Sequence, residues 1–157
     1  MAFQTTWYFS ELPKEVVELI EKDSIIPDTH WLGGFVWHYI ERANRENFLY
    51  DLSHLDGSSL KLKTYNEGEG QTWHVDAKPV LGDEDVRKIS FTVQLSGYDD
   101  YEGGNVEFID ESGGRYFIPR KRGTVALFDS RTQHRVHKVT KGTRKSLVGW
   151  CVGPQWS

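Results

Sequence analysis

The triplet His74-Val75-Asp76 carries the clearest chemical potential in the sequence. Alternate residues of an extended strand point to the same face, so the imidazole of His74 and the carboxylate of Asp76 are expected to project side by side. Two histidines and one carboxylate bind one face of Fe(II) in non-haem iron sites and leave three positions open. His74 and Asp76 supply two of these ligands, and a second histidine must come from elsewhere in the chain.

That second histidine is found about sixty residues later. The apolar run Gly123–Phe128 predicts a buried strand, and His134 lies just beyond the turn that follows it. His137 is a competing candidate, but it differs from His134 by three positions and therefore points to the opposite face of a strand. From the residues alone, a strand-end histidine beside a surface aspartate is the alternative to a metal site.

The last predicted strand carries an inward-facing cation. In Arg144–Val152 the residues Arg144, Ser146, Val148 and Trp150 share one face. A buried guanidinium needs an anion, because burying an unpaired charge is very costly. A carboxylate held by Arg144 beside the Ser146 hydroxyl satisfies this need. It is either one of the chain's own acids or an external dicarboxylate co-substrate, and the two histidines and the aspartate favour the latter.

The elements that must position these residues are expected to be helices first and short strands afterwards. Periodicity predicts a strand within residues 1–10, a helix after Pro13, a break at residues 24–29 and a helix from about Gly34 to Phe48. After Asn47, short alternating segments are separated by glycine turns. This order predicts a mainly β fold with N-terminal helices, a double-stranded β-helix (a jelly roll of the cupin-like kind) supported by those helices.

The predicted strands fill most of the second part of the chain. They are Leu60–Tyr65, Arg87–Leu95, Val106–Ile109, Tyr116–Ile118, Thr124–Phe128 and Arg144–Val152. The second of these alternates apolar and polar residues and is expected to be half-buried. Without an internal repeat or a linker, we expect a single domain over residues 1–157, with about 1–55 as helical support and about 56–157 as the jelly-roll core.

The composition indicates a folded protein without a general affinity for polyanions. A chain of 157 residues is long enough to bury one core. The net charge of −4 gives no general attraction to nucleic acid or to an anionic membrane. Cys151 is the one cysteine, which excludes an intramolecular disulfide and suits a reducing compartment. With neither a signal segment nor a membrane-spanning apolar stretch, a soluble cytoplasmic protein is expected.

Several short motifs occur in one order across residues 60–152. They are Tyr65 ahead of His74-Val75-Asp76, the strand Arg87–Leu95, Tyr101-Glu102-Gly103-Gly104, Gly123–Phe128, His134-Arg135-Val136, Val139–Arg144 and Trp150. In this combination the chain resembles the Fe(II)- and 2-oxoglutarate-dependent oxygenases of the prolyl 4-hydroxylase-like group, and it is especially similar to short bacterial and phage-type members. The block Trp31–Asp51 also resembles the helical support of those members.

The resemblance implies roles for individual residues. It assigns His74, Asp76 and His134 as the iron ligands and Arg144, ten residues after the second histidine, as the ligand of the distal carboxylate of 2-oxoglutarate. His137 stands where relatives often carry proline and is placed at the surface or the pocket rim. The other residues implied to contact or surround the co-substrate are Tyr65, which would hydrogen-bond it, Trp150, which would wall its pocket, and Ser146, Thr92 and Gln94.

Two positions depart from the pattern of the family. Gln94 stands where relatives often have tyrosine, so hydrogen bonding to the co-substrate is expected to differ there. Gln71 replaces a usual aromatic residue in the loop before His74.

Two basic residues are candidates for contacts with the prime substrate. Lys63 alternates, together with Lys61, onto the face of Tyr65. Arg87 follows the segment Pro79–Asp85, which relatives use as a lid over the substrate. The alternative for each cation is exposure to solvent.

The resemblance implies an enzyme that hydroxylates an unactivated C–H bond with Fe(II), O2 and 2-oxoglutarate and releases succinate and CO2. A prolyl residue of a peptide or protein is the favoured substrate, with ascorbate as a stimulant of turnover. The alternatives are a hydroxylase of a free amino acid or small metabolite and a non-catalytic, cupin-like metal- or ligand-binding module. The acidic net charge disfavours a nucleic-acid demethylase, and zinc hydrolysis lacks a dedicated general base.

Overall fold

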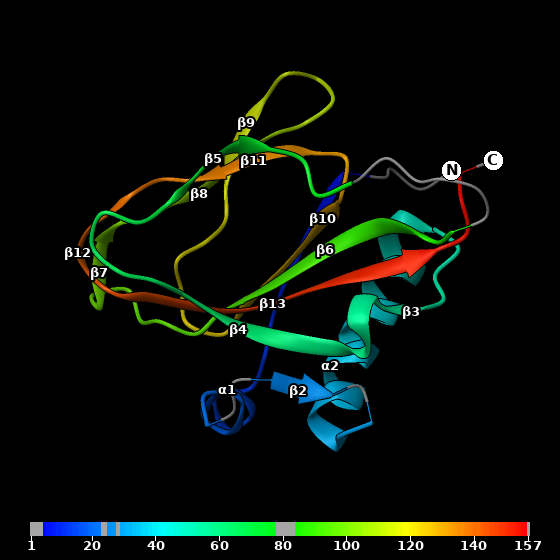
Figure 1. The fold of residues 1–157 in the computed structure, drawn as a ribbon, viewed down its shortest axis with the longest axis horizontal. Coiled ribbons are helices and arrows are strands. Elements are labelled where there is room, and N and C mark those ends of the chain that lie inside the picture. The colour runs from blue at the N-terminus through cyan, green and yellow to red at the C-terminus, as the bar shows by residue number, and fades with distance from the viewer. Residues whose placement is uncertain (1–4, 23–24, 28, 78–83, 157) are drawn as a thin grey trace.

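The computed structural model describes residues 5–22, 25–27, 29–77 and 84–156. Its strands form a seven-stranded sheet, a four-stranded sheet and a two-stranded sheet, which we call the large, small and end sheets. Figure 1 shows the small sheet above the large sheet, the helices below the large sheet and the end sheet at one side. The two β layers with helices on one face agree with the predicted helix-supported jelly roll.

The large sheet is antiparallel throughout and has the order β1-β10-β6-β13-β4-β2, with β3 pairing with β13. Its strands are β1 (Trp7–Glu11), β2 (Ile25–Pro27), β3 (His54–Leu55), β4 (Ser59–Tyr65), β6 (Val86–Gln94), β10 (Thr124–Asp129) and β13 (Arg144–Gly153). The first 55 residues therefore supply strands of this sheet as well as the helices.

The small and end sheets close the other side of the molecule. The small sheet has the order β5-β11-β8-β9, formed by β5 (Gln71–His74), β11 (Gln133–Val136), β8 (Val106–Ile109) and β9 (Arg115–Phe117). The end sheet pairs β7 (Tyr101–Gly103) with β12 (Val139–Gly142). Apolar and aromatic residues fill the space between the large and small sheets, among them Phe108, Phe128, Val106 and Val136.

The helices cover the outer face of the large sheet. They are α1 (Lys14–Ile20) and α2 (Trp31–Ala43), which continues as a π-helical turn, Asn44–Phe48; a 3-10 turn, Asp56–Ser58, precedes β4. His30 caps α2 through a hydrogen bond from the backbone N–H of Leu32 to its Nδ1 atom. The buried side chains of α2 recur at helical spacing and pack on the sheet: Leu32, Val36, Ile40 and Ala43.

Two expectations about secondary structure were wrong. The predicted break at residues 24–29 contains β2, a three-residue edge strand that pairs with β4. The strand Arg87–Leu95 is not half-buried, because β6 lies between β10 and β13 and most of its side chains are buried on both faces. Its apolar face packs under the helices, and its polar face lines the space between the sheets.

A membrane-spanning helix is not present in the described part of the chain, since none of its helices is both long enough and apolar enough.

Candidate metal centre and co-substrate pocket

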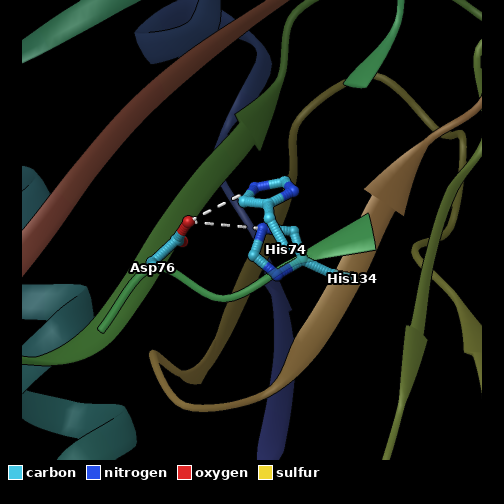
Figure 2. A group of neighbouring side chains, drawn as sticks. All are labelled: His74, Asp76 and His134. Carbon is cyan, nitrogen blue, oxygen red and sulfur yellow. Dashed lines mark ion pairs between the residues drawn. The ribbon is translucent and has the colours of Figure 1, made fainter. Parts of the chain in front are cut away.

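Three metal-ligating side chains converge between the two sheets. His74 ends β5, Asp76 follows two residues later, and His134 lies on β11. The Nε2 atoms of His74 and His134 each lie 3.5 Å from Oδ1 of Asp76, and one ligand atom from each of the three residues lies within 4.8 Å of the others. Figure 2 shows both rings and the carboxylate pointing toward one another. The structure thus brings together the three residues that the sequence predicted as ligands.

Backbone hydrogen bonds determine which ring nitrogen faces the cluster. Nδ1 of His74 lies 2.7 Å from the carbonyl oxygen of Thr72, and Nδ1 of His134 lies 3.0 Å from that of Thr132. A carbonyl oxygen only accepts, so each Nδ1 carries the proton and each Nε2 presents a lone pair. Burial lowers the pKa of His134, an effect that the Asp76 carboxylate partly offsets. The neutral ring that this favours is the form that binds a metal ion.

The second carboxylate oxygen of Asp76 is held by two donors. Oδ2 accepts a hydrogen bond from the Ser90 hydroxyl at 2.6 Å and one from the indole N–H of Trp150 at 3.0 Å. The Ser90 hydroxyl also lies 3.0 Å from the hydroxyl of Ser130, whose carbonyl oxygen accepts from the backbone N–H of Asp76. These bonds leave Oδ1 to face the histidines, so Asp76 is oriented to bind a cation through one oxygen.

Arg144 brings a buried positive charge into the same region. Its side chain is only 3% exposed, and no carboxylate of the described residues forms an ion pair with it. Burial lowers the pKa of Arg144, an effect that the nearby side chains of Tyr101 and Tyr65 partly offset. A guanidinium buried without an anion is costly. The chain itself supplies no such anion here, which removes the alternative that Arg144 pairs with an internal acid of the described residues.

Ser146, two residues further along β13, is a second buried polar residue, and its hydroxyl has no hydrogen-bond partner among the described residues. Arg144 and Ser146 share one face of β13, and both line a cavity of about 290 Å³. His74, Asp76 and His134 line the same cavity. A ligand with acceptor oxygens would therefore satisfy Arg144 and Ser146 while reaching toward the three-residue cluster.

The other residues expected around a co-substrate have different surroundings. Tyr65, Thr92 and Trp150 line the cavity, and Trp150 also holds Asp76. Gln94 does not line the cavity: its buried side-chain amide donates to the Tyr101 hydroxyl at 2.7 Å. Gln94 thus contacts Tyr101 and not the cavity.

The structure adds two residues that sequence reasoning missed. Ser90 holds Asp76, and a signal for it was available, since Ser90, Thr92 and Gln94 form a polar row that alternates with apolar residues of β6. Tyr101 opens the motif Tyr101-Glu102-Gly103-Gly104, but sequence reasoning assigned it no role, because its place beside Arg144 depends on how the end sheet folds. Arg120 fixes it there, by donating to the carbonyl oxygen of Tyr101 at 2.8 Å and stacking 4.0 Å from the centre of its ring.

The structure also places His137 and Gln71, whose roles the sequence did not decide. His137 lies outside it, with Nε2 3.0 Å from Oε1 of Glu107. Gln71 lines the cavity and accepts a hydrogen bond of 3.4 Å from the Tyr65 hydroxyl. The proposed lid, Pro79–Asp85, lies largely outside the described residues, which resume at Glu84.

Both basic candidates for substrate contact, Lys63 and Arg87, line the cavity. Arg87 donates from Nε to Oδ2 of Asp56 at 2.8 Å, and its guanidinium lies 4.0 Å from the ring centre of Trp150. Lys61 is exposed and is not among the residues that line the cavity.

Comparisons with known proteins agree with this arrangement. Residues 60–152 match the sequence model of the family described as the 2OG-Fe(II) oxygenase superfamily. A PKHD-type hydroxylase of Idiomarina loihiensis is 38% identical over 92 residues, which cover 58% of this chain and 40% of the relative. A PKHD-type hydroxylase of a Synechococcus species is 34% identical over 144 residues, or 91% of this chain and 56% of the relative. The chain thus spans well under two thirds of the length of these curated relatives.

A solved structure has the same fold at low sequence identity. The viral collagen prolyl hydroxylase of Paramecium Bursaria Chlorella virus-1, in complex with 2OG, superimposes with a TM-score of 0.75 at 15% identity, covering 96% of this chain and 97% of the viral one. At this identity the likeness establishes the fold alone. The family match covers more than half of the chain and most of the jelly-roll core. The chain therefore belongs to the 2OG-Fe(II) oxygenase superfamily, whose name states the cofactor and co-substrate that its members use.

Proposed function

We propose that this chain is an Fe(II)- and 2-oxoglutarate-dependent hydroxylase. One observation carries the proposal: a single cavity is lined by His74, Asp76 and His134 and also by Arg144 and Ser146. Among the described residues, Arg144 has no carboxylate partner and the Ser146 hydroxyl has no hydrogen-bond partner. The metal cluster alone would suit several oxygenase types. The buried Arg144 favours one that uses a dicarboxylate co-substrate.

The donor set fits Fe(II). Two neutral imidazoles and one carboxylate oxygen, from His74, His134 and Asp76, match the facial arrangement that leaves three positions open on the metal. Bound there with its co-substrate, iron supplies the O2 chemistry that hydroxylates an unactivated C–H bond with release of succinate and CO2. The chain supplies ligation and orientation, through the backbone bonds to the imidazoles and the donors to Asp76.

The co-substrate pocket is proposed to run from this cluster to Arg144. The guanidinium of Arg144 would take the distal carboxylate of 2-oxoglutarate through paired hydrogen bonds, and the Ser146 hydroxyl would donate to the same group. Tyr65 would hydrogen-bond the co-substrate, and Thr92 and Trp150 would form the walls. These residues all line the cavity.

For the prime substrate we propose a prolyl residue of a peptide or protein. The kinship with PKHD-type hydroxylases and the shared fold of the viral prolyl hydroxylase support this choice. A free amino acid or small metabolite is the second substrate class. Stimulation by ascorbate is part of the proposal, and so is the organisation of residues 1–157 as one catalytic domain.

The test is anaerobic titration of the metal-free protein with Fe(II) and then 2-oxoglutarate. We expect a weak visible charge-transfer band from the chelated complex, followed in air by Fe(II)-dependent conversion of 2-oxoglutarate to succinate, measured with and without ascorbate. Asp76→Ala should abolish both signals. A protein that shows no band, and no binding of 2-oxoglutarate by calorimetry, would be a binding module that retains the fold without the chemistry.

A further inference from the structure

The charged side chains that line the cavity are mostly cationic. Lys63, Arg87 and Arg144 face a single carboxylate, Asp76, within the described part of the lining. Such an excess of one sign in a concave site attracts ligands of the opposite charge and raises their association rate.

Two of the three cations have a partner or a proposed one. Arg87 is paired with Asp56 at 2.8 Å, and its guanidinium is stacked on Trp150. Arg144 is buried and is assigned to the distal carboxylate of the co-substrate. Lys63 differs from Arg87 because it forms no ion pair with any carboxylate of the described residues, and it differs from Arg144 because its side chain is exposed.

Lys63 lies beside the residues proposed to hold the co-substrate. It lies on β4 directly across from Ser146 of β13. Its Nζ atom is 5.4 Å from the ring centre of Tyr65, while the guanidinium carbon of Arg144 is 5.8 Å from the same centre. Arg144 is buried and Lys63 is exposed, so Lys63 is the cation of the lining that remains accessible to a second ligand from solvent.

A count of charges leaves Lys63 uncompensated in the loaded site. The Asp56 carboxylate offsets Arg87. The remaining positive charges are two on iron and one each on Lys63 and Arg144, and the Asp76 carboxylate with a dianionic co-substrate supplies three negative charges against them, so one positive charge is left. The histidine rings are neutral in this count. One further anionic group on the prime substrate would complete the balance.

We propose that the prime substrate carries a carboxylate and that Lys63 receives it. This inference rests on the proposed function and gives it a substrate class. The carboxylate belongs either to an acidic residue near the hydroxylated position of a peptide or to the α-carboxyl group of a free amino acid. Both offer the same chemistry to an ammonium group, and the experiment separates them.

The experiment follows the charge-transfer band of the anaerobic Fe(II)–2-oxoglutarate complex while a second ligand is added. The peptide probes are three blocked tripeptides with a central proline and flanking glutamate, glutamine or lysine residues. The amino-acid probes are free proline and prolinamide. We expect the glutamate peptide to bind at least tenfold more tightly than the glutamine peptide if the substrate is a peptide, or proline at least tenfold more tightly than prolinamide if it is an amino acid.

The matched variants are Lys63→Glu and Lys61→Glu. Both lysines are exposed on the same face of β4, but only Lys63 lines the cavity. We expect Lys63→Glu to remove the preference for the acidic probe while changing the dissociation constant of 2-oxoglutarate by well under tenfold. Lys61→Glu, which introduces the same charge, should keep the preference.

The proposal is overturned if the five probes show no dependence on charge, whether all of them bind or none does. It is also overturned if Lys63→Glu keeps the preference, or if it weakens 2-oxoglutarate binding tenfold, which would place Lys63 in the co-substrate site. The band itself reports on the iron and 2-oxoglutarate before any probe is added. Failure of the proposed function is therefore visible separately, as absence of the band.

Discussion

His74 and His134 are direct neighbours across the antiparallel pair of β5 and β11, and their ring centres lie 4.1 Å apart. Both side chains project into the space between the sheets because facing residues of paired strands point to the same side. A slip of one residue in this register would turn one imidazole to the opposite face. The register of two short strands is thus what places two residues, sixty positions apart in the chain, next to one carboxylate.

The first prediction concerns which histidine binds the metal. His134→Ala should abolish Fe(II) binding or weaken it at least a hundredfold, because it removes one of three ligands. His137→Ala should leave the affinity within about twofold, since that ring is bonded to Glu107 and lies outside the cluster. Calorimetry with Fe(II) under nitrogen measures both. Equal losses in the two variants would mean that the metal does not sit between His74 and His134.

The second prediction concerns the donors that hold Asp76. Ser90→Ala removes the 2.6 Å hydrogen bond to Oδ2, and we expect Fe(II) affinity to fall by about 10- to 100-fold, the usual effect of losing a partner of a metal ligand. Trp150→Phe, which removes the other donor, should act in the same direction. Thr92→Ala is the control, because Thr92 lies on the same face of β6 but does not touch Asp76. Undiminished Fe(II) affinity in Ser90→Ala would show that Asp76 needs no such support.

The third prediction concerns Tyr101, the aromatic residue beside Arg144. Tyr101→Phe deletes the hydroxyl that accepts from Gln94 and lies against the guanidinium. We expect the dissociation constant of 2-oxoglutarate to rise by about tenfold, the value of one hydrogen bond, while Fe(II) affinity stays unchanged. Tyr98→Phe is the matched control, since Tyr98 is 67% exposed in the turn just before β7. If both variants bound 2-oxoglutarate as the wild type does, Tyr101 would have no part in placing Arg144.

The sequence predicted the fold to the extent that local patterns determined it. The strand Val106–Ile109 has the predicted bounds, and Thr124–Phe128 differs by one residue from β10, because alternation and glycine turns mark such strands locally. The short β2 was missed because its three residues are stabilised by pairing with β4 and not by a pattern of their own. The burial of β6 on both faces was missed for a similar reason. The residues of one strand do not show which strands lie beside it in the sheet.

The same distinction holds for the candidate site. His74 and Asp76 alone are a weak signal, and the roles of these two residues, His134 and Arg144 were predicted from the order of motifs that the chain shares with the family. Gln94 was expected in the cavity wall because it alternates with Thr92. Its side-chain amide instead donates a hydrogen bond to the hydroxyl of Tyr101 in the end sheet. That contact joins segments that no periodic pattern relates, so it could only be read from the tertiary structure.

The anchor of the turn that leads to His134 gives the last prediction. Asp129 ends β10 with its carboxylate 4% exposed, and it accepts hydrogen bonds from the Tyr50 hydroxyl and from Nε and Nη2 of Arg131. Burial alone would raise the pKa of Asp129, but the hydrogen bonds from Arg131 and Tyr50 outweigh it and lower the pKa. The ionised form therefore stabilises the folded protein.

Because the pKa of Asp129 is lower in the folded than in the unfolded state, this contribution is complete above about pH 4, the ordinary range of an aspartate, and is lost as the pH falls through the lowered value. Asp129→Asn should reduce the free energy of unfolding by about 2 kcal/mol at neutral pH, the scale of hydrogen bonds to a charged group. The difference from the wild type should shrink steadily below about pH 4. Urea unfolding at a series of pH values measures it, with Asp99→Asn as the exposed control. A difference that stayed constant down to about pH 2 would mean that the charge of Asp129 is not what holds this turn in place.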